Sequence, residues 1–344
     1  MHSRDQNIQN RETCTFTQAV PEPAERFLRS ELKELLKFVH MQMTNAVFSI
    51  PDYRDPNSAW TEHLPFAFFL AETLKPSVFV ELGTHYGNSY FSFCQLFRQE
   101  NLPVRTYAVD TWEGDVHAGF YGREVFEEVS KFNNENYSHF SNLLNMTFDE
   151  AHDLFEPSSI DLLHIDGMHS YESVKHDFDF WLPLMSEKGV ILLHDTKVLD
   201  RGFGVWRLME ELRERFPCIE FPHGYGLGVV CTGKNVDKGF MEFVARWKQD
   251  AFILPFFEAM GQRVSFLFKN QSLSGEIEDL RKQLAGKQSE TGRLQGLLDE
   301  NRKLLSEKEE LISRVLSSRS WRITRPLRYL TENLYPGKRA DSKT

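Results

Sequence analysis

The chain has 344 residues, of which 41% are hydrophobic, and its formal net charge is −10 at pH 7. This length allows one large core or two modest ones, and the acidic balance argues against nucleic-acid binding, which needs a basic surface. The four cysteines form no CxxC or CxxH pair, so neither a disulfide framework nor a zinc site is expected. Residues 1–21 lack the apolar centre of a secretory signal, and no stretch approaches the ~18 uninterrupted apolar residues of a membrane span. We therefore expect a cytoplasmic protein.

Residues 1–55 form the first predicted region, a polar start followed by a helix. In residues 24–43, "AERFLRSELKELLKFVHMQM", the residues Phe27, Leu28, Leu32, Leu35 and Val39 recur at helical spacing. We expect this helix to pack on the domain that follows.

Residues 56–235 form the second predicted region, in which short apolar runs alternate with helical segments. Strands are predicted near residues 77–82, 104–110, 142–147, 160–165 and 189–194, followed by a pair of strands joined through Gly224 and Gly226. This alternation is typical of a mainly parallel sheet that helices cover on both faces. Ligands of such sheets bind at the carboxyl ends of the strands.

A glycine turn follows the first of these strands, in "VFVELGTHYGNSYFSF". Glu81, Gly83 and Gly87 frame a turn into a helix that begins near Ser89, which places backbone N–H groups and a carboxylate beside a strand end. The spacing is GxxxG, which fits the dinucleotide fingerprint GxGxxG badly. The second strand ends in Asp110, where a carboxylate can accept both hydroxyls of a ribose. Together these residues favour a nucleoside ligand over a structural coincidence.

Two later strands also end in polar side chains. The run 160–165 is followed by Asp166 and, three residues later, by His169, while the run 189–194 ends in His194 and is followed by Asp195. An imidazole titrates near neutrality and can act as a general base, and two carboxylates suit Mg²⁺ or Mn²⁺. The structural alternative for His169 is a helix cap or a partner for a buried carboxylate.

The stretches "VELGTHYGNS", "AVDTWEGD", "LLHIDGMHSYESVKHDFDFWLP" and "GVILLHDT" resemble, in this order, the motifs of class I S-adenosylmethionine-dependent methyltransferases. More narrowly, they resemble sugar and macrolide-sugar O-methyltransferases associated with bacterial surface-polysaccharide glycosyltransferases. The resemblance spans about residues 60–233. It implies a Rossmann-like α/β fold with seven strands, mainly parallel with an antiparallel last strand. It also implies an enzyme that methylates a sugar hydroxyl in a cell-surface polysaccharide or a related glycoside.

The same resemblance implies a role for each motif. The methionine part of the cofactor is expected near residues 81–87, the ribose on Asp110 and the adenine near residues 145–153. The expected cofactor contacts are Glu81, Gly83, Thr84, Gly87, Ser89, Asp110, Thr111 and Asp166. His169 matches the general base of the macrolide-sugar enzymes, and Asp166 shares the catalytic role.

A divalent cation is the second ligand that the resemblance implies. In metal-dependent relatives three acidic or amide groups hold the cation, and Asp166 and Asp195 match two of their positions, whereas His194 or Thr196 stands at the third. We therefore predict Asp166, Asp195 and His194 as ligands of Mg²⁺ or another divalent cation, with a metal-free site as the alternative.

The remaining residues divide into three segments. Residues 236–270 are predicted to form apolar connecting helices. Across residues 271–318, thirteen positions from Leu273 to Val315 step by alternating four and three residues, and nine of them are Leu, Ile or Val. This is a coiled-coil heptad pattern, which predicts a homo-oligomer or pairing with another protein's coiled coil. Residues 319–344 form a basic, aromatic tail.

The basic tail could bind a partner. It interleaves Arg319, Arg322 and Arg325 with Trp321, a composition that suits an anionic membrane surface or an acidic partner. The alternative is a solvated tail without a binding function. It also resembles the basic segment that closes coiled coils in polysaccharide glycosyltransferases, so a glycosyltransferase partner and a peripheral position at the inner membrane face are expected from the resemblance. The rival function is a scaffold with little turnover that recruits such a glycosyltransferase. A nicotinamide-dependent oxidoreductase would need GxGxxG and lacks it.

Overall fold

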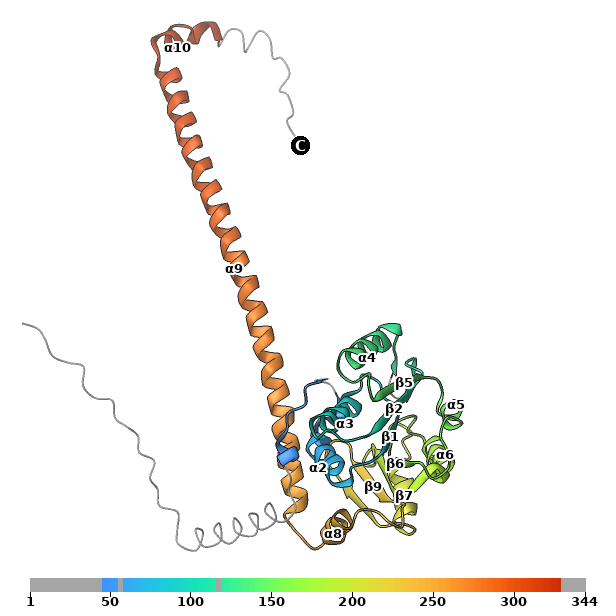
Figure 1. The fold of residues 1–344 in the computed structure, drawn as a ribbon. Coiled ribbons are helices and arrows are strands. Elements are labelled where there is room, and N and C mark those ends of the chain that lie inside the picture. The colour runs from blue at the N-terminus through green and yellow to red at the C-terminus, as the bar shows by residue number, and fades with distance from the viewer. Residues whose placement is uncertain (1–44, 55–57, 116–118, 329–344) are drawn as a thin grey trace, which may run out of the picture. The chain divides into compact units, whose positions relative to one another are not determined.

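The computed structural model describes residues 45–54, 58–115 and 119–328 (Figure 1). The chain divides into two compact units, residues 1–270 and 271–344. The helix predicted within residues 24–43 lies outside the described residues.

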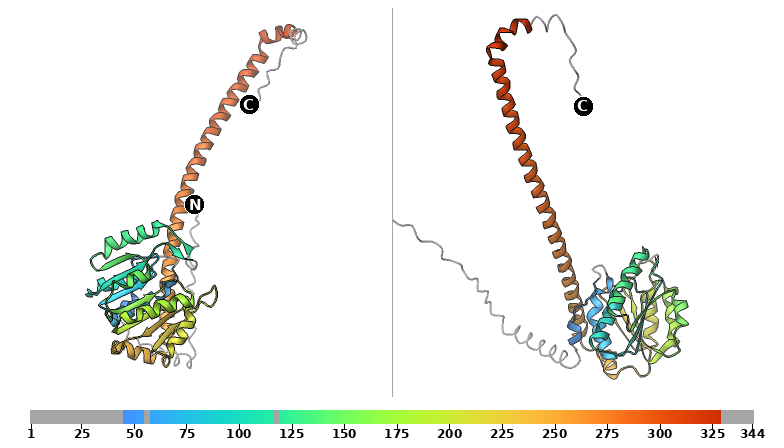
Figure 2. Two further views of the ribbon diagram at one scale, coloured as in Figure 1. Left: turned by 90° about the vertical axis from the view of Figure 1, so that its right-hand side faces the viewer. Right: turned by 45° about the horizontal axis from the view of Figure 1, so that its top comes forward.

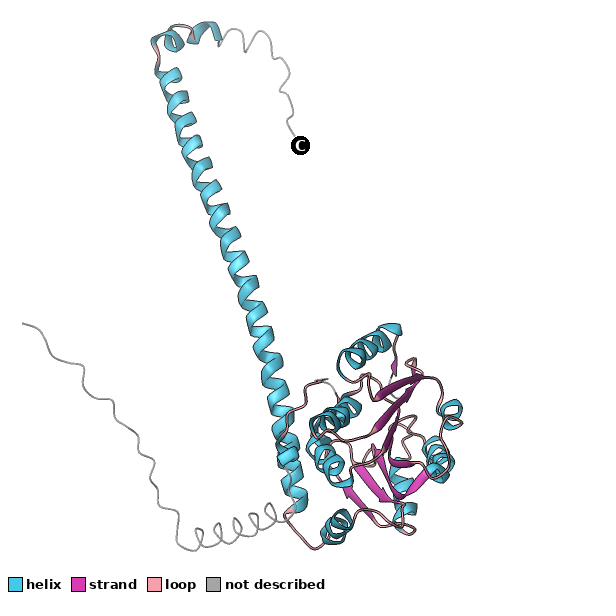
Figure 3. Cartoon of the chain, in the orientation of Figure 1, coloured by secondary structure: helices cyan, strands magenta, loops and turns pink. Residues whose placement is uncertain are grey.

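A seven-stranded sheet forms the centre of the first unit (Figure 3). Its strands lie in the order β5-β2-β1-β6-β7-β9-β8. The strands β5, β2, β1, β6 and β7 are parallel to one another, while β9 is antiparallel to both β7 and β8. The sheet confirms the predicted Rossmann-like fold with an antiparallel last strand. The strand bounds are β1 (Val78–Leu82), β2 (Arg105–Asp110), β5 (Ser141–Asn145), β6 (Ile160–Ile165), β7 (Met185–His194), β8 (Cys218–Phe221) and β9 (Leu227–Cys231).

Helices cover both faces of this sheet, and the strand residues alternate between the two cores. Phe79 and Leu162 face one core, and Val80 and Leu163 face the other. Helices α2 and α3 lie on the opposite side of the sheet from α5 and α6 (Figures 1 and 2). The first core takes side chains from α2 (Leu64–Leu74), α3 (Asn88–Gln99), α4 (Arg123–Asn136), α8 (Lys238–Arg246) and the start of α9 (Ile253–Ser317). The second takes them from α5 (Phe148–His152), α6 (Tyr171–Trp181) and α7 (Val205–Arg213).

Short elements complete the unit. The 3-10 helices are η1 (Asn45–Phe48), η2 (Ala59–His63) and η3 (Leu182–Leu184). The Ser58 side chain caps η2 by accepting a hydrogen bond from the backbone N–H of Trp60, and the buried Trp60 then enters the core. Strands β3 (Gly114–Asp115) and β4 (Gly119–Phe120) form a two-stranded hairpin after β2.

The strand register brings the polar strand tips together. Leu82 of β1 lies between Val109 of β2 and Ile165 of β6, and Ile165 pairs in turn with Leu193 of β7. The residues that follow these positions therefore meet at one edge of the sheet, because parallel strands end on the same side.

The second unit begins within helix α9. This helix runs without interruption from Ile253 to Ser317, with Pro255 in its first turn, where a missing N–H costs no helical hydrogen bond. Among the predicted heptad positions, the apolar ones are exposed, from 45% at Val315 to 62% at Leu280. A short helix α10 (Arg319–Ile323) follows. None of the helices in the described part of the chain combines the length and apolar character that a membrane crossing requires.

Candidate active site

A cavity of about 800 Å³ opens at the carboxyl ends of β1, β2, β6 and β7. Thr147 and Phe148, from the segment expected near adenine, contribute to its wall. All of the expected cofactor contacts except Glu81 line it, namely Gly83, Thr84, Gly87, Ser89, Asp110, Thr111 and Asp166. The predicted catalytic His169 and the predicted metal ligands His194 and Asp195 line the same cavity.

The turn after β1 depends on glycine at two positions. Gly83 has φ = +85° and Gly87 has φ = +84°, a left-handed conformation that glycine adopts without strain. A Cβ atom on Gly83 would collide with the backbone carbonyl of Asp166. Gly87 is the N-cap of α3, whose first backbone N–H groups have no partner within the helix. The turn therefore offers hydrogen-bond donors to the cavity.

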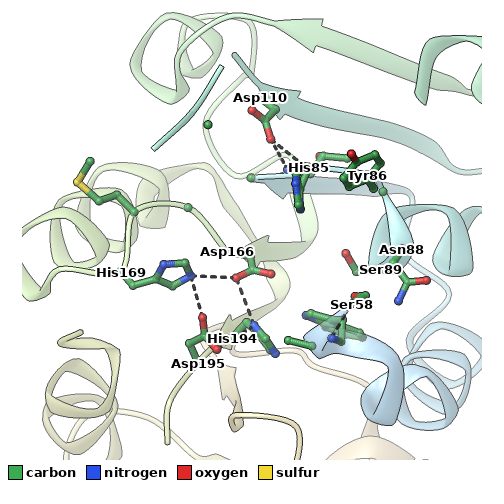
Figure 4. A pocket seen from close by; sticks show the side chains of 18 of the residues that line it. Ser58, His85, Tyr86, Asn88, Ser89, Asp110, Asp166, His169, His194 and Asp195 are labelled. Carbon is green, nitrogen blue, oxygen red and sulfur yellow. Dashed lines mark hydrogen bonds and ion pairs between the residues drawn. The ribbon is translucent and has the colours of Figure 1, made fainter. Parts of the chain in front are cut away.

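Asp110, at the tip of β2, is held by three backbone N–H groups. Its Oδ2 accepts hydrogen bonds from the backbone N–H groups of Thr84 at 2.9 Å and His85 at 2.8 Å (Figure 4). Its Oδ1 accepts one from Trp112 at 2.7 Å. An ionised carboxylate has about four lone-pair positions. Three are thus occupied by backbone, so Asp110 retains about one for a ligand rather than the two that both ribose hydroxyls would use.

Glu81 lies fully buried beneath the glycine turn and contacts His164 instead of the cavity. The indole N–H of Trp60 donates to His164 Nε2 at 3.0 Å, so Nε2 must be the acceptor and Nδ1 carries the proton. Nδ1–H then donates to Glu81 Oε2 at 2.8 Å. Burial raises the pKa of Glu81, against the opposing effect of His164. His164 therefore has the structural role that its place within β6 favours.

Asp166, His169 and Asp195 meet at the tips of β6 and β7. The Nε2 atom of His169 lies 3.3 Å from Asp166 Oδ1 and 3.0 Å from Asp195 Oδ2 (Figure 4). Asp195 adopts φ = +60°, which is uncommon for a residue with a side chain. Strain of this kind is usually found where the surroundings fix a functional side chain.

His194 stands on the other side of Asp166. Its Nδ1 lies 3.3 Å from Asp166 Oδ1 and 3.5 Å from Asp195 Oδ1. Its Nε2 lies 3.1 Å from the backbone carbonyl of Gly224, which can only accept, so Nε2 donates. This fixes the ring with Nδ1 toward the two carboxylates.

The charges of this cluster shift the pKa values of its members. Burial alone would raise the pKa of Asp166, but the charge of His194 and the hydrogen bonds from His169 and His194 lower it well below its ordinary value. Burial alone would lower the pKa of His169, but its hydrogen bonds to Asp166 and Asp195 raise it to about 10. His169 is therefore protonated at neutral pH in this arrangement.

Asp166, His169 and Asp195 also form a group that can hold a metal ion. One ligand atom from each lies within 4.8 Å of the others, and within the described ranges this is the group of His, Cys, Asp and Glu side chains with that property. Two of its members are predicted ligands. The predicted third ligand, His194, lies beside the group with Nδ1 facing both carboxylates.

Phe203 is a site residue that the sequence reasoning missed. Its ring stacks on His169 with the ring centres 4.5 Å apart and the planes 10° from parallel. The backbone N–H of Gly204 donates to the His169 carbonyl at 2.8 Å. The loop that begins at Asp195 thus contacts His169 at both of its ends. No sequence pattern marks this contact, because Phe203 is in a loop and 34 residues from His169.

Residues 80–196 match the family model described as a methyltransferase domain. This stretch runs from within β1 to just beyond β7 and includes every predicted site residue. A curated relative, the uncharacterized protein y4gI of Sinorhizobium fredii, is 46% identical over 211 residues, which are 61% of this chain and 23% of that protein. The chain thus spans less than a quarter of the length of this relative.

Solved methyltransferase structures are more distant. The SAH-bound methyltransferase PaMTH1 of Podospora anserina is 14% identical, with a TM-score of 0.40 over 62% of this chain and 97% of that one. The O-methyltransferase TomG of Streptomyces achromogenes, in complex with SAM, is 17% identical, with a TM-score of 0.39 over 58% and 95%. The fold assignment rests on the strand order described above and not on these likenesses.

Proposed function

We propose that the first unit is an S-adenosylmethionine-dependent O-methyltransferase. The observation that carries this proposal is one cavity, in a stretch that matches a methyltransferase domain, that joins the glycine turn after β1 to the cluster of Asp166, His169 and Asp195. The turn suits a cofactor with a charged amino-acid end, and the cluster suits the removal of a proton from an alcohol. When bound, the cofactor supplies an electrophilic methyl group on sulfur.

A buried polar atom without a partner supports the fit of this cofactor. Thr84 Oγ1 is buried and has no hydrogen-bond partner among the described residues, and Thr84 lines the cavity. A ligand ammonium is a donor that this oxygen lacks, and a ligand carboxylate can accept from the N–H groups at the start of α3. Asp110 then offers its remaining lone pair to one ribose hydroxyl.

His169 is the proposed base for the acceptor hydroxyl. Deprotonation is needed because a neutral alcohol is a weak nucleophile. His169 must first lose its own proton, which Asp166 and Asp195 stabilise. A divalent cation bound by Asp166, Asp195 and His194 would neutralise both carboxylates, so that His169 could lose this proton and act as the base. Such a cation would also supply Lewis acidity to the acceptor oxygen.

A sugar hydroxyl is the proposed acceptor. Aromatic and polar side chains line the cavity together, with Trp60, Tyr86, Tyr121 and Tyr225 among them. Sugars bind to such surfaces because their apolar ring faces stack and their hydroxyls form hydrogen bonds.

Calorimetry and a transfer assay test this function. The full chain is titrated with S-adenosylhomocysteine and, separately, with NAD⁺, and we expect binding of the first alone. Transfer of a labelled methyl group from S-adenosylmethionine to a panel of glycosides is then measured with and without a chelator. Failure of the sulfur compounds to bind would refute the proposal. Binding without transfer to any acceptor, with or without added metal, would favour the scaffold instead.

Self-association through α9 is a second proposal, made for the second unit. The apolar heptad positions, including Leu284 and Leu298, are about half exposed on the described helix, and such a stripe is stable only when a partner covers it. The double variant L284D/L298D should reduce the mass measured by sedimentation equilibrium, whereas S289D, on the opposite side of the heptad, should not. An unchanged mass in L284D/L298D would refute the proposal.

The basic segment after α9 is the proposed contact with a membrane or a glycosyltransferase. In the described part of the tail, Trp321, Ile323 and Leu327 are exposed beside Arg322 and Arg325, and the guanidinium of Arg328 lies 3.6 Å from the centre of the Trp321 ring. Cosedimentation with anionic vesicles, and its loss in R322Q/R325Q, would support membrane contact at the cytoplasmic face. Equal pelleting of the variant would contradict it.

A further inference from the structure

The cavity is larger than the proposed cofactor needs, and its remaining wall contains an arginine beside the proposed base. Ligand pockets for drug-sized molecules occupy roughly 300–1,000 Å³, so a cavity of about 800 Å³ has room for a nucleoside cofactor and part of an acceptor. His169, Phe203 and Arg201 lie together in this wall. Arg201 therefore borders the space in which an acceptor would lie.

Phe203 sets the distance between Arg201 and the reacting position. The centre of its ring is 4.5 Å from that of His169 and 4.8 Å from the guanidinium carbon of Arg201. Because both groups contact the Phe203 ring, the guanidinium carbon lies at most about 9 Å from the centre of the imidazole, a span that one sugar residue can bridge. Arg201 and Gly202 both have positive φ angles, +54° and +78°, and so form a left-handed turn just before Phe203.

The hydrogen-bonding capacity of Arg201 is largely unused. Its Nε lies 3.5 Å from Asp200 Oδ1, and this carboxylate is 79% exposed, so water screens the pair. An arginine fork has five N–H donors in a plane that matches carboxylate and phosphate oxygens. The two terminal nitrogens of Arg201 remain available to such a group.

Arg54, the other arginine that lines the described part of the cavity, is engaged elsewhere. Its Nε donates to the Pro51 carbonyl at 3.2 Å, and its guanidinium lies 5.5 Å from the centre of the Phe268 ring. The carboxylates nearest to His169, those of Asp166 and Asp195, face the two imidazoles. Arg201 is therefore the cation placed to bind an acceptor.

We propose that Arg201 binds an anionic group of the acceptor, a phosphate or a carboxylate, about one sugar ring from the hydroxyl that is methylated. This inference rests on the proposed function, since it names the acceptor class of the same cavity. It predicts that sugar phosphates or acidic sugars are preferred over neutral glycosides. Arg201 would determine specificity without taking part in the transfer of the methyl group.

Binding of simple sugars to the full chain saturated with S-adenosylhomocysteine tests the proposal. Glucose 1-phosphate, glucuronate and glucose are titrated at low ionic strength, and we expect at least one of the two anions to bind tenfold or more tightly than glucose. The R201Q variant should lose that preference by roughly tenfold, a typical consequence of removing one charge-assisted contact. The R201K variant should fall in between, because lysine keeps the charge and loses the planar fork.

Two matched variants control for nonspecific charge effects. R207Q removes an arginine of α7 that lies over the ring of Tyr171 and does not line the cavity. R54Q removes the arginine of the cavity wall that already has other partners. Neither should change anion binding more than about twofold. The relative affinity of the two anions shows whether phosphate or carboxylate is recognised.

The outcomes separate this proposal from the function on which it rests. Loss of anion preference in R201Q, with unchanged affinity for S-adenosylhomocysteine, supports it. Equal binding of the anions by R201Q and by the natural chain overturns it. So does the absence of anion binding by the natural chain at concentrations up to about 10 mM, which would detect even a weak site. Failure of S-adenosylhomocysteine to bind is measured first and counts against the proposed function instead.

Discussion

Asp110 and Asp166 lie at the ends of β2 and β6, the two strands that flank β1, yet the chain uses them in different ways. Asp110 accepts hydrogen bonds from three backbone N–H groups and so holds two turns together, with about one lone pair left for a ligand. Asp166 meets the imidazoles of His169 and His194, both of which can change protonation. The partners of a strand-tip carboxylate thus decide its role: backbone N–H partners make it structural, and titratable partners allow it to take part in proton transfer.

The strongest test of this contrast removes the titratable partner. H169A should lower methyl transfer by roughly 10² to 10⁴, the usual contribution of a general base, while affinity for S-adenosylhomocysteine changes little. Turnover and binding are measured separately by a labelled-methyl assay and calorimetry. H176A is the matched control, because His176 pairs with the exposed Asp149 outside the cavity and should leave turnover unchanged. Full activity in H169A would remove this residue from the mechanism.

Removing Asp110 should instead lower the free energy of unfolding. D110A leaves the N–H groups of Thr84, His85 and Trp112 without their acceptor, and we expect a loss of roughly 3 kcal/mol in denaturant unfolding. D110N should lose less, because one amide oxygen can still accept from Thr84 and His85. Stability within about 0.5 kcal/mol of the natural chain in D110A would show that these turns hold without the carboxylate.

Asp177 is a third carboxylate, and it differs from Asp110 and Asp166 because its pKa is raised by burial. Asp177 on α6 is 7% exposed, and burial raises its pKa to about 7, with His176 opposing the shift. Its folded pKa lies above its unfolded value, so the stability that its protonation contributes is complete below about pH 4 and is lost as the pH rises through about 7. D177N should therefore stabilise the protein at pH 8, by roughly 1–2 kcal/mol, and not at pH 4.

The control for this smaller effect is D179N on the same helix. Asp179 pairs with Lys175 at 3.0 Å and is half exposed, so its replacement should change stability by less than about 1 kcal/mol at either pH. Thermal unfolding of both variants at pH 4 and pH 8 measures the difference. Equal behaviour of D177N and D179N at pH 8 would contradict the raised pKa of Asp177.

The parts of the fold with a periodic or apolar pattern could be predicted from the sequence. The apolar runs located the strands of the central sheet, and β7 begins earlier than expected because Ser186, Glu187 and Lys188 hide its first residues from an apolar pattern. The proximity of Asp166, His169 and Asp195 could also be predicted, because these residues follow two strands that pair in parallel and so end at the same edge of the sheet.

The contacts that loops make could not be predicted in this way. Phe203 reaches His169 from a loop, and Trp60 reaches His164 from a 3-10 helix 104 residues earlier in the chain. Neither has a spacing that places it, because irregular segments carry no repeat. The occupation of Asp110 by backbone N–H groups was missed for the same reason, since the path of the turn at residues 83–87 decides it.

The backbone segments at Gly83 and Asp166 lie in close contact, which restricts how the two can move relative to each other. The backbone N–H of Asp166 donates to the Leu82 carbonyl at 2.8 Å, and no side chain fits between Gly83 and the Asp166 carbonyl. The turn that would hold the methyl donor and the strand tip that would receive the proton are therefore clamped into one rigid part. Adaptation to a new acceptor would have to come from the middle of the loop after β7, residues 197–202, because the two ends of this loop contact His169 through Asp195 and Phe203.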